Sequence, residues 1–397
     1  MNNYLISTLL ILILGAAGTA VANHAVSPNP EDWWRGSNGV MQYVAPDEAT
    51  IPNTDLGNSI RYGKQILEET YKTLGPDSGL PYSYVNSRLS CTNCHMESGR
   101  AAYGQPWAVV WYKYGAGGQG PWSARSNQYL NMKNRIHDCT QRSMNGTRLP
   151  DDSYQLNSMI EYMKWLSTGM KVAYSSVNHG NNNIAAPVVA ELTRAADPVR
   201  GKTVYEETCA FCHGVDGEGV WDESAKNYIY PAVWGPYSFN VGAGMYRLRT
   251  AVGFIKGNMP YGWTNATDTS HQLSNEDAWD SMAYVISKDR PAWSASLEDW
   301  QYYQPSNCAP NWTLKATQLD AGYESYYPRI KPDGTLTGDL SYPAKYSPEK
   351  HKYGPWRNPG EDMVAEMTAI KSSYDTYYAA ANPKPVYPGC SPFEYHP

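Results

Sequence analysis

The chain has 397 residues, too many for one ordinary hydrophobic core, so its length suits two domains or slightly more. Hydrophobic residues make up 42% of the chain, which is enough for buried cores, while charged residues make up 18%, against about 25% in typical soluble domains. The net charge of −6 and the lack of any basic run exclude a nucleic-acid-binding protein.

The N-terminus carries a predicted export signal. An apolar run over residues 5–14 leads to Ala-Val-Ala at 20–22, which resembles an A-x-A cleavage site, although no Lys or Arg precedes the run. We therefore predict a signal peptide over 1–22 and a periplasmic or otherwise extracytoplasmic protein; the alternative is an uncleaved anchor over 4–22. The low charge and the 33 tyrosines, against 4 phenylalanines, suit acidic fluid outside the cytoplasm, or else reflect compositional drift.

The first predicted helix covers residues 56–75, where Ile60, Ile66 and Leu67 lie near helical spacing. It precedes the motif Cys-Thr-Asn-Cys-His at residues 91–95. The spacing C-x-x-C-H is the attachment signal of c-type haem. Its two thiols form thioethers with the haem vinyl groups, and the histidine binds the iron from the proximal side.

A second predicted helix, over residues 151–167, closes this first segment. Its apolar residues recur at i, i+3, i+4 and i+7, and Asp151 or Asp152 is the expected N-cap. The polar stretch that follows, over 176–190, is typical of a linker.

The next segment repeats the same plan. A leading helix ends in Cys-Ala-Phe-Cys-His at residues 209–213, and a closing helix is predicted over 273–287, with Ser274 as N-cap and Asp277 in a variant capping box. Two such motifs indicate two covalently bound haem c groups, because a zinc site or a pair of disulfides does not explain a histidine in the same place twice. The expected haem-binding residues are Cys91, Cys94, His95, Cys209, Cys212 and His213.

These patterns predict a mainly α fold with two tandem class I cytochrome c-like domains and an irregular Tyr/Pro-rich C-terminal extension. The expected segments are the signal peptide (1–22), an N-terminal extension (23–50), a first domain with the active-site haem (51–175), the linker (176–190), a second domain with the electron-transfer haem (191–290) and a wrapping extension (291–397). One further helix is predicted inside the extension, over 359–380.

Each iron needs a second axial group, which decides whether it transfers electrons or takes part in chemistry. In the second domain we predict Met259, which a proline follows in an irregular loop; the alternative is a core methionine. The equivalent zone of the first domain offers Cys139, His137 and Met144. Neighbouring arginines such as Arg135 would lower the pKa of the Cys139 thiol and favour it as a ligand, while the alternative is that His137 binds the iron.

Two cysteines lie in the C-terminal extension. Export favours oxidation, so we predict a disulfide between Cys308 and Cys390. This pairing leaves Cys139 as the one cysteine outside a recognisable pair.

The chain resembles the dihaem thiosulfate dehydrogenases, cytochromes that interconvert thiosulfate and tetrathionate. The similarity covers about residues 52–288, in strings such as LGNSIRYG, RIHDCTQRSMNG, WGPYSFNVGAGM and FIKGNMPYG, and returns in the extension at YSPEKHKYGPW. The resemblance implies that Cys139 binds the active-site iron. It also implies that Arg125, Arg135 and Ser143 form a pocket for the substrate anion.

Two positions differ from the family pattern. His137 stands where the family commonly has Asn, which keeps the alternative ligand open. Asn258, where some relatives have Lys, precedes Met259, so no Lys/Met ligand switch is expected.

The expected reaction joins two thiosulfate ions to tetrathionate, or runs in reverse. Cys139 would carry the sulfane sulfur of one thiosulfate, because a covalent adduct divides the joining of two dianions into two steps. Arg125 and Arg135 suit oxyanions, although each could instead pair with a haem propionate. Electrons would leave through the second haem to a soluble cytochrome c or a membrane oxidase. The rival functions are a non-enzymatic dihaem electron carrier, a thiolate-haem subunit of a sulfur-oxidation system, and a structural cytochrome of a respiratory or extracellular assembly.

Overall fold

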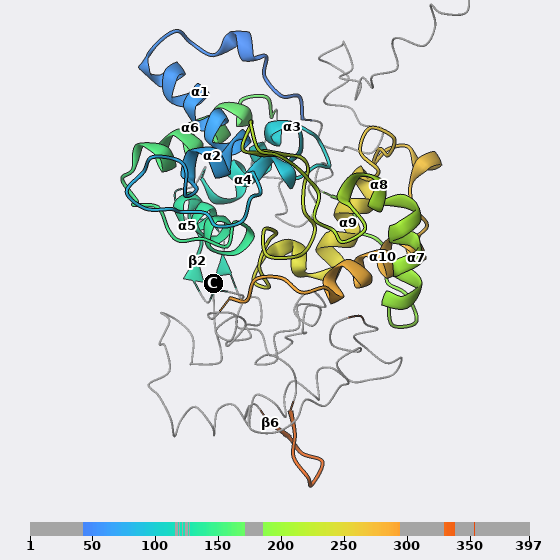
Figure 1. Ribbon diagram of the computed structural model, residues 1–397. Coiled ribbons are helices and arrows are strands. Elements are labelled where there is room, and N and C mark those ends of the chain that lie inside the picture. The colour runs from blue at the N-terminus through green and yellow to red at the C-terminus, as the bar shows by residue number, and fades with distance from the viewer. Residues whose placement is uncertain are drawn as a thin grey trace, which may run out of the picture.

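The computed structural model describes residues 43–115, 118, 120, 122–123, 126, 128–170, 186–293, 329–337 and 353. The described fold is mainly helical, as predicted (Figure 1). The helices of the first half are α1 (Asp55–Glu68), α2 (Thr70–Leu74), α3 (Met96–Gly99), α4 (Trp107–Tyr114), α5 (Met132–Asp138) and α6 (Tyr154–Ser167). Those of the second half are α7 (Pro198–Thr208), α8 (Ala210–His213), α9 (Leu248–Asn258) and α10 (Asn275–Ser287). Three antiparallel hairpins pair β1 (Trp122–Ser123) with β2 (Gln128–Tyr129), β3 (Val220–Asp222) with β4 (Asn227–Tyr230), and β5 (Arg329–Ile330) with β6 (Leu336–Thr337).

In each half, the leading helix crosses the closing helix at a glycine. A Cβ atom on Gly63 of α1 would lie 2.0 Å from the carbonyl oxygen of Ser158 in α6. A Cβ atom on Gly201 of α7 would lie 1.8 Å from the carbonyl oxygen of Asp280 in α10. Since no real Cβ approaches so closely, glycine is required at both crossings, and the two halves share one packing device.

The helix ends follow local chemistry that the sequence predicts only in part. The expected helix over 56–75 is divided into α1 and α2, because Glu69 leaves the helical region with φ −120° and ψ 45°. The predicted N-cap of α6 is wrong: the cap is Ser153, whose Oγ accepts from the Leu156 N–H at 3.3 Å. The cap of α10 is confirmed, since Ser274 Oγ accepts from the Asp277 N–H at 3.0 Å.

The hydrophobic core consists of two clusters. One cluster fills the first half and the other fills the second half. The first cluster also takes in Tyr228, Phe239 and Ala243 from the second half of the chain. Met245 and Tyr246 pack against both clusters, so the two halves are joined by shared packing.

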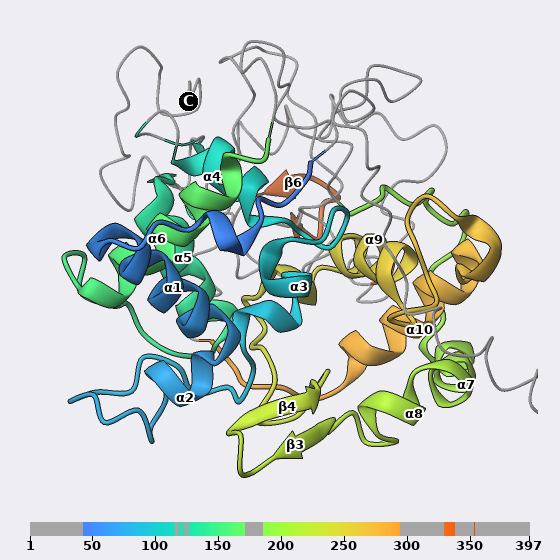
Figure 2. The ribbon, with the colours of Figure 1, turned by 90° about the horizontal axis from the view of Figure 1, so that it is seen from above.

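Polar contacts support the same junction. In Figure 2 the β3–β4 hairpin lies between α2 and α8, and the side-chain amide of Asn227 in β4 donates to the carbonyl of Glu68 at 3.0 Å. Further along, the backbone N–H of Asn240 donates to the carbonyl of Arg142 at 3.2 Å. The Asn240 side chain donates to the carbonyl of Gln141 at 2.8 Å. The segment after β4 is thereby held against the first half, beside the end of α5.

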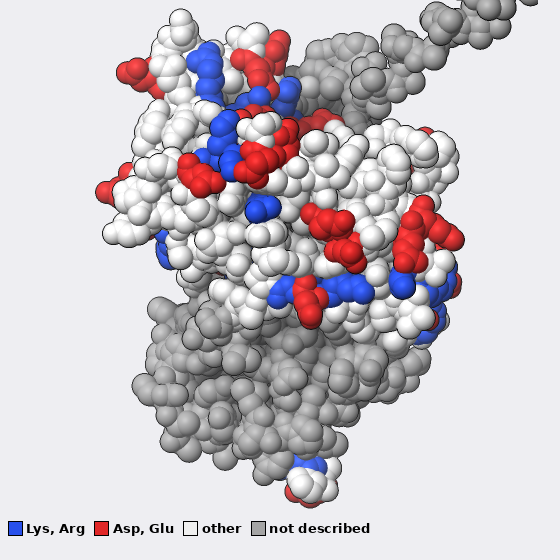
Figure 3. Space-filling view, in the orientation of Figure 1, with Lys and Arg blue, Asp and Glu red and all other residues white. Residues whose placement is uncertain are grey.

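On the face shown in Figure 3, acidic and basic side chains of the described residues lie in mixed groups. Ion pairs link the N-terminal segment to the first half: Glu48 pairs with Lys64 of α1 at 3.2 Å and with Arg100 at 3.0 Å. These contacts hold the chain before α1 against the helices that follow.

Several predictions lie outside the described residues. They are the signal peptide over 1–22, the Cys308–Cys390 disulfide, the helix over 359–380 and most of the extension over 291–397. In the part of the chain that is described, no helix has the length and apolar character needed to cross a membrane.

Candidate active site

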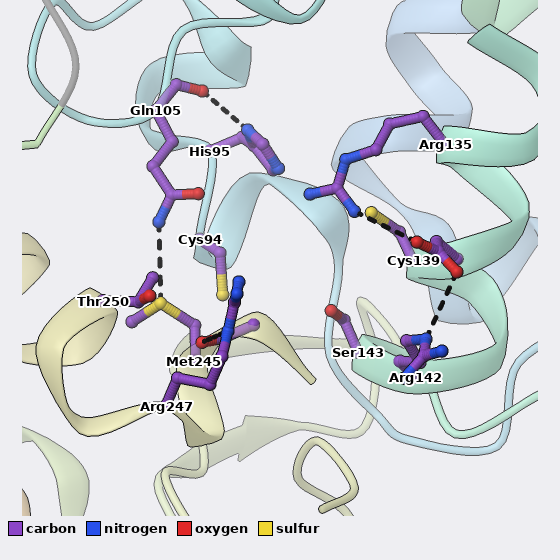
Figure 4. Close-up of a pocket in the computed structure, with 12 residues that line it drawn as sticks. Cys94, His95, Gln105, Arg135, Cys139, Arg142, Ser143, Met245, Arg247 and Thr250 are labelled. Atoms are coloured by element: carbon purple, nitrogen blue, oxygen red, sulfur yellow. Dashed lines mark hydrogen bonds and ion pairs between the residues drawn. The ribbon is translucent and has the colours of Figure 1, made fainter. Parts of the chain in front are cut away.

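A cavity in the first half gathers residues from three parts of the chain (Figure 4). The space between these residues, counted together with the solvent at its opening, is about 470 Å³. The first haem motif and the loop after it contribute Cys94, His95 and Gln105; α5 and the turn after it contribute Arg135, Asp138, Cys139, Arg142 and Ser143; the second half contributes Gly244, Met245, Arg247 and Thr250. The cavity therefore brings together three of the predicted site residues of α5 and its turn, Arg135, Cys139 and Ser143.

His95 is oriented so that its Nε2 atom can bind a metal. Its Nδ1 lies 2.6 Å from the carbonyl oxygen of Gln105, so Nδ1 carries the proton and Nε2 keeps its lone pair. A carbonyl behind the imidazole is the usual second partner of a metal-bound histidine. Burial lowers the pKa of His95 to about 4, which keeps the ring neutral as a ligand must be. The histidine thus fits the proximal position of a haem.

Cys139 lies across the cavity from His95. Both residues line the same cavity, and in Figure 4 the guanidinium group of Arg135 lies between the sulfur of Cys139 and the imidazole of His95. Cys139 starts a π-helical turn, η3 (Cys139–Ser143), which directly continues α5. Such turns are rare and often occur at functional sites, because the wider turn redirects side chains. Here the turn lets both Cys139 and Ser143 reach the same cavity.

The cavity wall beside Cys139 is cationic. The pKa of Arg135 is raised, mainly by the negative charge of a Cys139 thiolate, while burial opposes the shift. Arg135 also pairs with Asp138 at 3.8 Å, and the Nε of Arg142 donates to the same carboxylate at 3.2 Å. Arg142 is only 4% exposed and its NH1 donates to the Gly242 carbonyl at 3.3 Å. One buried carboxylate thus holds two guanidinium groups beside the sulfur.

The sequence did not predict the contribution of the second half to this cavity. Met245, Arg247 and Thr250 come from the segment that leads into α9 and from its first turn. The one sequence feature that pointed to this segment was the string WGPYSFNVGAGM, residues 234–245, which carries part of the family resemblance. The string shows no helical or strand periodicity, so spacing alone could not place it. Arg247 is the third guanidinium group in the lining.

The two alternative ligands of the first half do not line the cavity. His137 is fully buried, and its Nε2 lies 2.8 Å from Asp151 Oδ1, while its Nδ1 has no hydrogen-bond partner among the described residues. Burial lowers the pKa of His137, and the bond to Asp151 opposes this shift. Met144 is 2% exposed and belongs to the hydrophobic core.

The second haem motif repeats the histidine geometry. The Nδ1 of His213 lies 2.7 Å from the carbonyl oxygen of Pro231, and burial lowers the pKa of this histidine as well. Met259 directly follows α9, is partly exposed and does not belong to either core cluster. The alternative of a core methionine therefore loses its support.

The four thiols of the two motifs fit thioether formation. Burial raises the pKa of Cys91 and Cys94 to about 12 and that of Cys209 to about 11. These cysteines, with Cys212, form no disulfide within the described residues. Arg125, the remaining predicted residue of the anion pocket, lies outside the described residues.

Comparisons with known proteins identify the family of the chain. Residues 198–288 match the Cytochrome c family. The chain is 36% identical over 277 residues to the thiosulfate dehydrogenase of Psychrobacter arcticus, covering 69% of this chain and 75% of that protein. It is 38% identical over 260 residues to the thiosulfate dehydrogenase of Allochromatium vinosum, covering 64% of this chain and 87% of that protein. The solved thiosulfate dehydrogenase TsdBA of Marichromatium purpuratum, in its as-isolated form, matches with a TM-score of 0.53 and 29% identity, over 63% of this chain and 50% of that chain. The chain belongs to the thiosulfate dehydrogenase family of cytochromes c.

Proposed function

We propose that this protein joins two thiosulfate ions to tetrathionate, or runs the reverse reaction, in the cavity between His95 and Cys139. The protein is an oxidoreductase that acts on thiosulfate, as its relatives indicate. One observation carries the site assignment: Cys139 and the neutral His95 line one cavity together with three guanidinium groups.

Two haem c groups suit the residues present. Cys91 and Cys94 would attach the first haem, and His95 and Cys139 would bind its iron. Cys209, Cys212, His213 and Met259 would hold the second in the same manner. When bound, haem supplies a one-electron redox centre. The buried neutral thiols and the two carbonyl-held histidines are the features of this chain that fit the group.

The side chains around Cys139 would bind and orient the substrate. Thiosulfate is a dianion, and Arg135, Arg142 and Arg247 place fixed positive charge at the cavity. The Ser143 hydroxyl can donate a further hydrogen bond to a sulfonate oxygen. Asp138 keeps Arg135 and Arg142 in place, so the pocket is charged before the substrate arrives.

The reaction would take place in two covalent steps at Cys139. A Cys139 thiolate released from iron would form a sulfur–sulfur bond with the sulfane sulfur of one thiosulfate, with the loss of two electrons that bound haem would accept. A second thiosulfate then attacks the same sulfane sulfur, a sulfur–sulfur bond forms, and the Cys139 thiolate departs as tetrathionate is released. Two thiosulfate ions thereby become one tetrathionate ion and two electrons, which a soluble cytochrome c or a membrane oxidase would take up.

The repeated geometry also supports the proposed organisation. Both halves use a glycine at the helix crossing and a carbonyl behind the histidine. We accordingly assign a first cytochrome c-like domain to residues 51–175 and a second to 191–290. We also propose export through residues 1–22, which N-terminal sequencing of the mature protein checks.

The decisive experiment compares Cys139→Gly with His137→Asn. Both purified full-length variants are assayed with thiosulfate and ferricyanide across acidic pH, with tetrathionate measured as the product and haem content as the control. Activity should disappear in Cys139→Gly and persist in His137→Asn. The reverse pattern, with two haems in each variant, would transfer the role to His137.

A further inference from the structure

A three-residue loop in the first half touches both candidate haem sites. Its last residue, Gln105, supplies the carbonyl oxygen that lies 2.6 Å from Nδ1 of His95. The side-chain amide of Gln105 points away and donates to the sulfur of Met245 at 3.5 Å, as Figure 4 shows. One residue therefore holds the proximal histidine of the first half and contacts the second half.

The first residue of the loop makes the complementary contact. The carbonyl oxygen of Tyr103 accepts a hydrogen bond from the side-chain amide of Asn258 at 3.0 Å. The same amide donates to the carbonyl of Phe254 at 2.9 Å, and Asn258 is 8% exposed. Since Asn258 directly precedes Met259, this bond links the loop to the candidate methionine ligand of the second haem.

Helix α9 connects the same two places. Arg247 and Thr250, at its beginning, line the first cavity, and Met259 directly follows its last residue. Its 11 residues give a rod roughly 16 Å long. A displacement at one end of α9 is therefore carried to the other end.

The loop is held in a backbone conformation that it would not adopt by itself. Tyr103 has φ 65° and Gln105 has φ 60°, in the left-handed region that residues with a Cβ avoid. Such conformations persist only where surrounding contacts impose them. The bonds to His95, Met245 and Asn258 hold the two ends of the loop, and backbone bonds of Gly104 to Met96 and Ala101 hold its middle.

We propose that Gln105 and Asn258 are positioning residues, and that the Tyr103–Gln105 loop couples the proximal histidine of one haem to the methionine ligand of the other. A change at the Met259 site then alters the ligand field at the His95 site, although the two belong to different halves of the chain. The inference rests on the ligands assigned under the proposed function.

The test uses the full-length protein with both haems bound. Asn258→Ala removes the amide that bonds to Tyr103, and electron paramagnetic resonance of the oxidised protein resolves the thiolate-ligated haem from the methionine-ligated haem. We expect the signals of both haems to change. We also expect the oxidation equilibrium of the first haem to move about five-fold, the effect of one ordinary hydrogen bond. A change confined to the second haem would overturn the coupling.

A matched control is Asn265→Ala, in the loop that follows Met259. The Asn265 side chain accepts hydrogen bonds from Thr267 at 2.8 Å, so its bonds stay within its own loop. This variant should leave the spectrum of the first haem unchanged. A first-haem shift equal to that of Asn258→Ala would show that any disturbance of the second half is transmitted, and would remove the special role of Asn258.

Two further variants keep the inference open to refutation if Asn258→Ala binds haem poorly. Asn258→Asp retains the size but loses the amide donors, and should act like Asn258→Ala. Gln105→Asn keeps an amide and tolerates positive φ, but is too short to reach Met245, which lines the first cavity, so it should shift the potential of the first haem and, through the loop, that of the second. Unchanged second-haem potentials in Gln105→Asn would contradict the coupling. If instead the wild-type protein forms no tetrathionate while these shifts occur, the proposed function fails and the coupling stands.

Discussion

The two halves of the molecule hold their histidines in the same way but differ on the opposite side. His95 and His213 each present Nδ1 to a backbone carbonyl, at 2.6 and 2.7 Å. Opposite His95 lie Cys139 and a cationic wall that the Asp138 carboxylate organises. In the second half the candidate ligand is Met259, and the residues after it are exposed, with Trp263 at 77%.

The two halves hold their histidines alike but differ in the candidate second ligand, and this difference suits two different roles. A neutral methionine in an open loop suits electron exchange with a partner, because it brings no reactive group and no anion site. A thiolate beside guanidinium groups suits a reaction of anionic sulfur compounds. The candidate ligands Cys139 and Met259, with the residues around them, would give the two halves their different proposed roles.

The largest expected effect comes from making the first half resemble the second. In Cys139→Met, both haems should remain bound, but tetrathionate formation should fall by about 10³-fold or more, because the attacking sulfur is lost. Steady-state kinetics with thiosulfate, together with haem quantification, measure this effect. Met144→Leu, at a core methionine outside the cavity lining, is the control and should keep the activity. Substantial turnover by Cys139→Met would remove the contrast between the halves.

A second prediction compares the two carboxylates that each bridge a pair of arginines. Asp138→Asn removes the negative charge between Arg135 and the buried Arg142, and should lower the free energy of unfolding by about 3 kcal/mol. Asp280→Asn should cost less, because the side chains of its partners Arg194 and Arg200 are 41% exposed. Denaturant unfolding of both variants measures the difference. Equal losses would mean that Arg135 and Arg142 depend on Asp138 no more than Arg194 and Arg200 depend on Asp280.

A smaller effect is expected from Arg247, a residue of the second half that lines the cavity of the first half. Arg247→Gln removes one guanidinium group from the cavity and should raise KM for thiosulfate about ten-fold, the effect of one charge-assisted hydrogen bond, with both haems still bound. Lys256→Gln, at the far end of α9, serves as a charge-matched control. A KM that stays at the wild-type value would limit the anion site to residues of the first half.

The smallest effect concerns pH. Burial acts to raise the pKa of Asp280, but hydrogen bonds from Arg194, from the N–H of Asp197 and from Arg200 outweigh it, so the pKa lies below its ordinary value. The stabilisation is therefore present above the unfolded pKa of about 3.9 and is lost as the pH falls through the folded value. Between pH 5 and pH 2, the wild-type protein should lose about 1 kcal/mol more stability than Asp280→Asn. Parallel pH profiles would contradict this assignment.

Local chemistry made much of the site predictable. The two C-x-x-C-H motifs predict the haem-binding thiols and histidines without any tertiary information. Helical spacing located α1, α6 and α10, because one apolar stripe per helix has to face a core. The resemblance to the family, and not spacing, singled out Cys139 over His137, and His137 turns instead to Asp151.

The rest depends on contacts between distant segments, which periodicity does not encode. Arg247 and Met245 reach the first cavity because the segment after β4 packs on the first half, through bonds such as that of Asn240 to the carbonyl of Arg142. The π-helical turn at Cys139 has no signature in the residue pattern. The cap of α6 is Ser153, one residue beyond the expected Asp151 or Asp152, and Asp151 instead contacts His137.

The segment that packs against both core clusters has a consequence for modular engineering. A chimera that exchanged everything after the linker at 176–190 would bring in a foreign electron-exit half, but also foreign versions of Met245, Arg247 and Thr250. Exchanging the half proposed to pass electrons to an acceptor would therefore also replace three residues of the cavity lining. The residues proposed to bind substrate and those proposed to transfer electrons could not be exchanged independently.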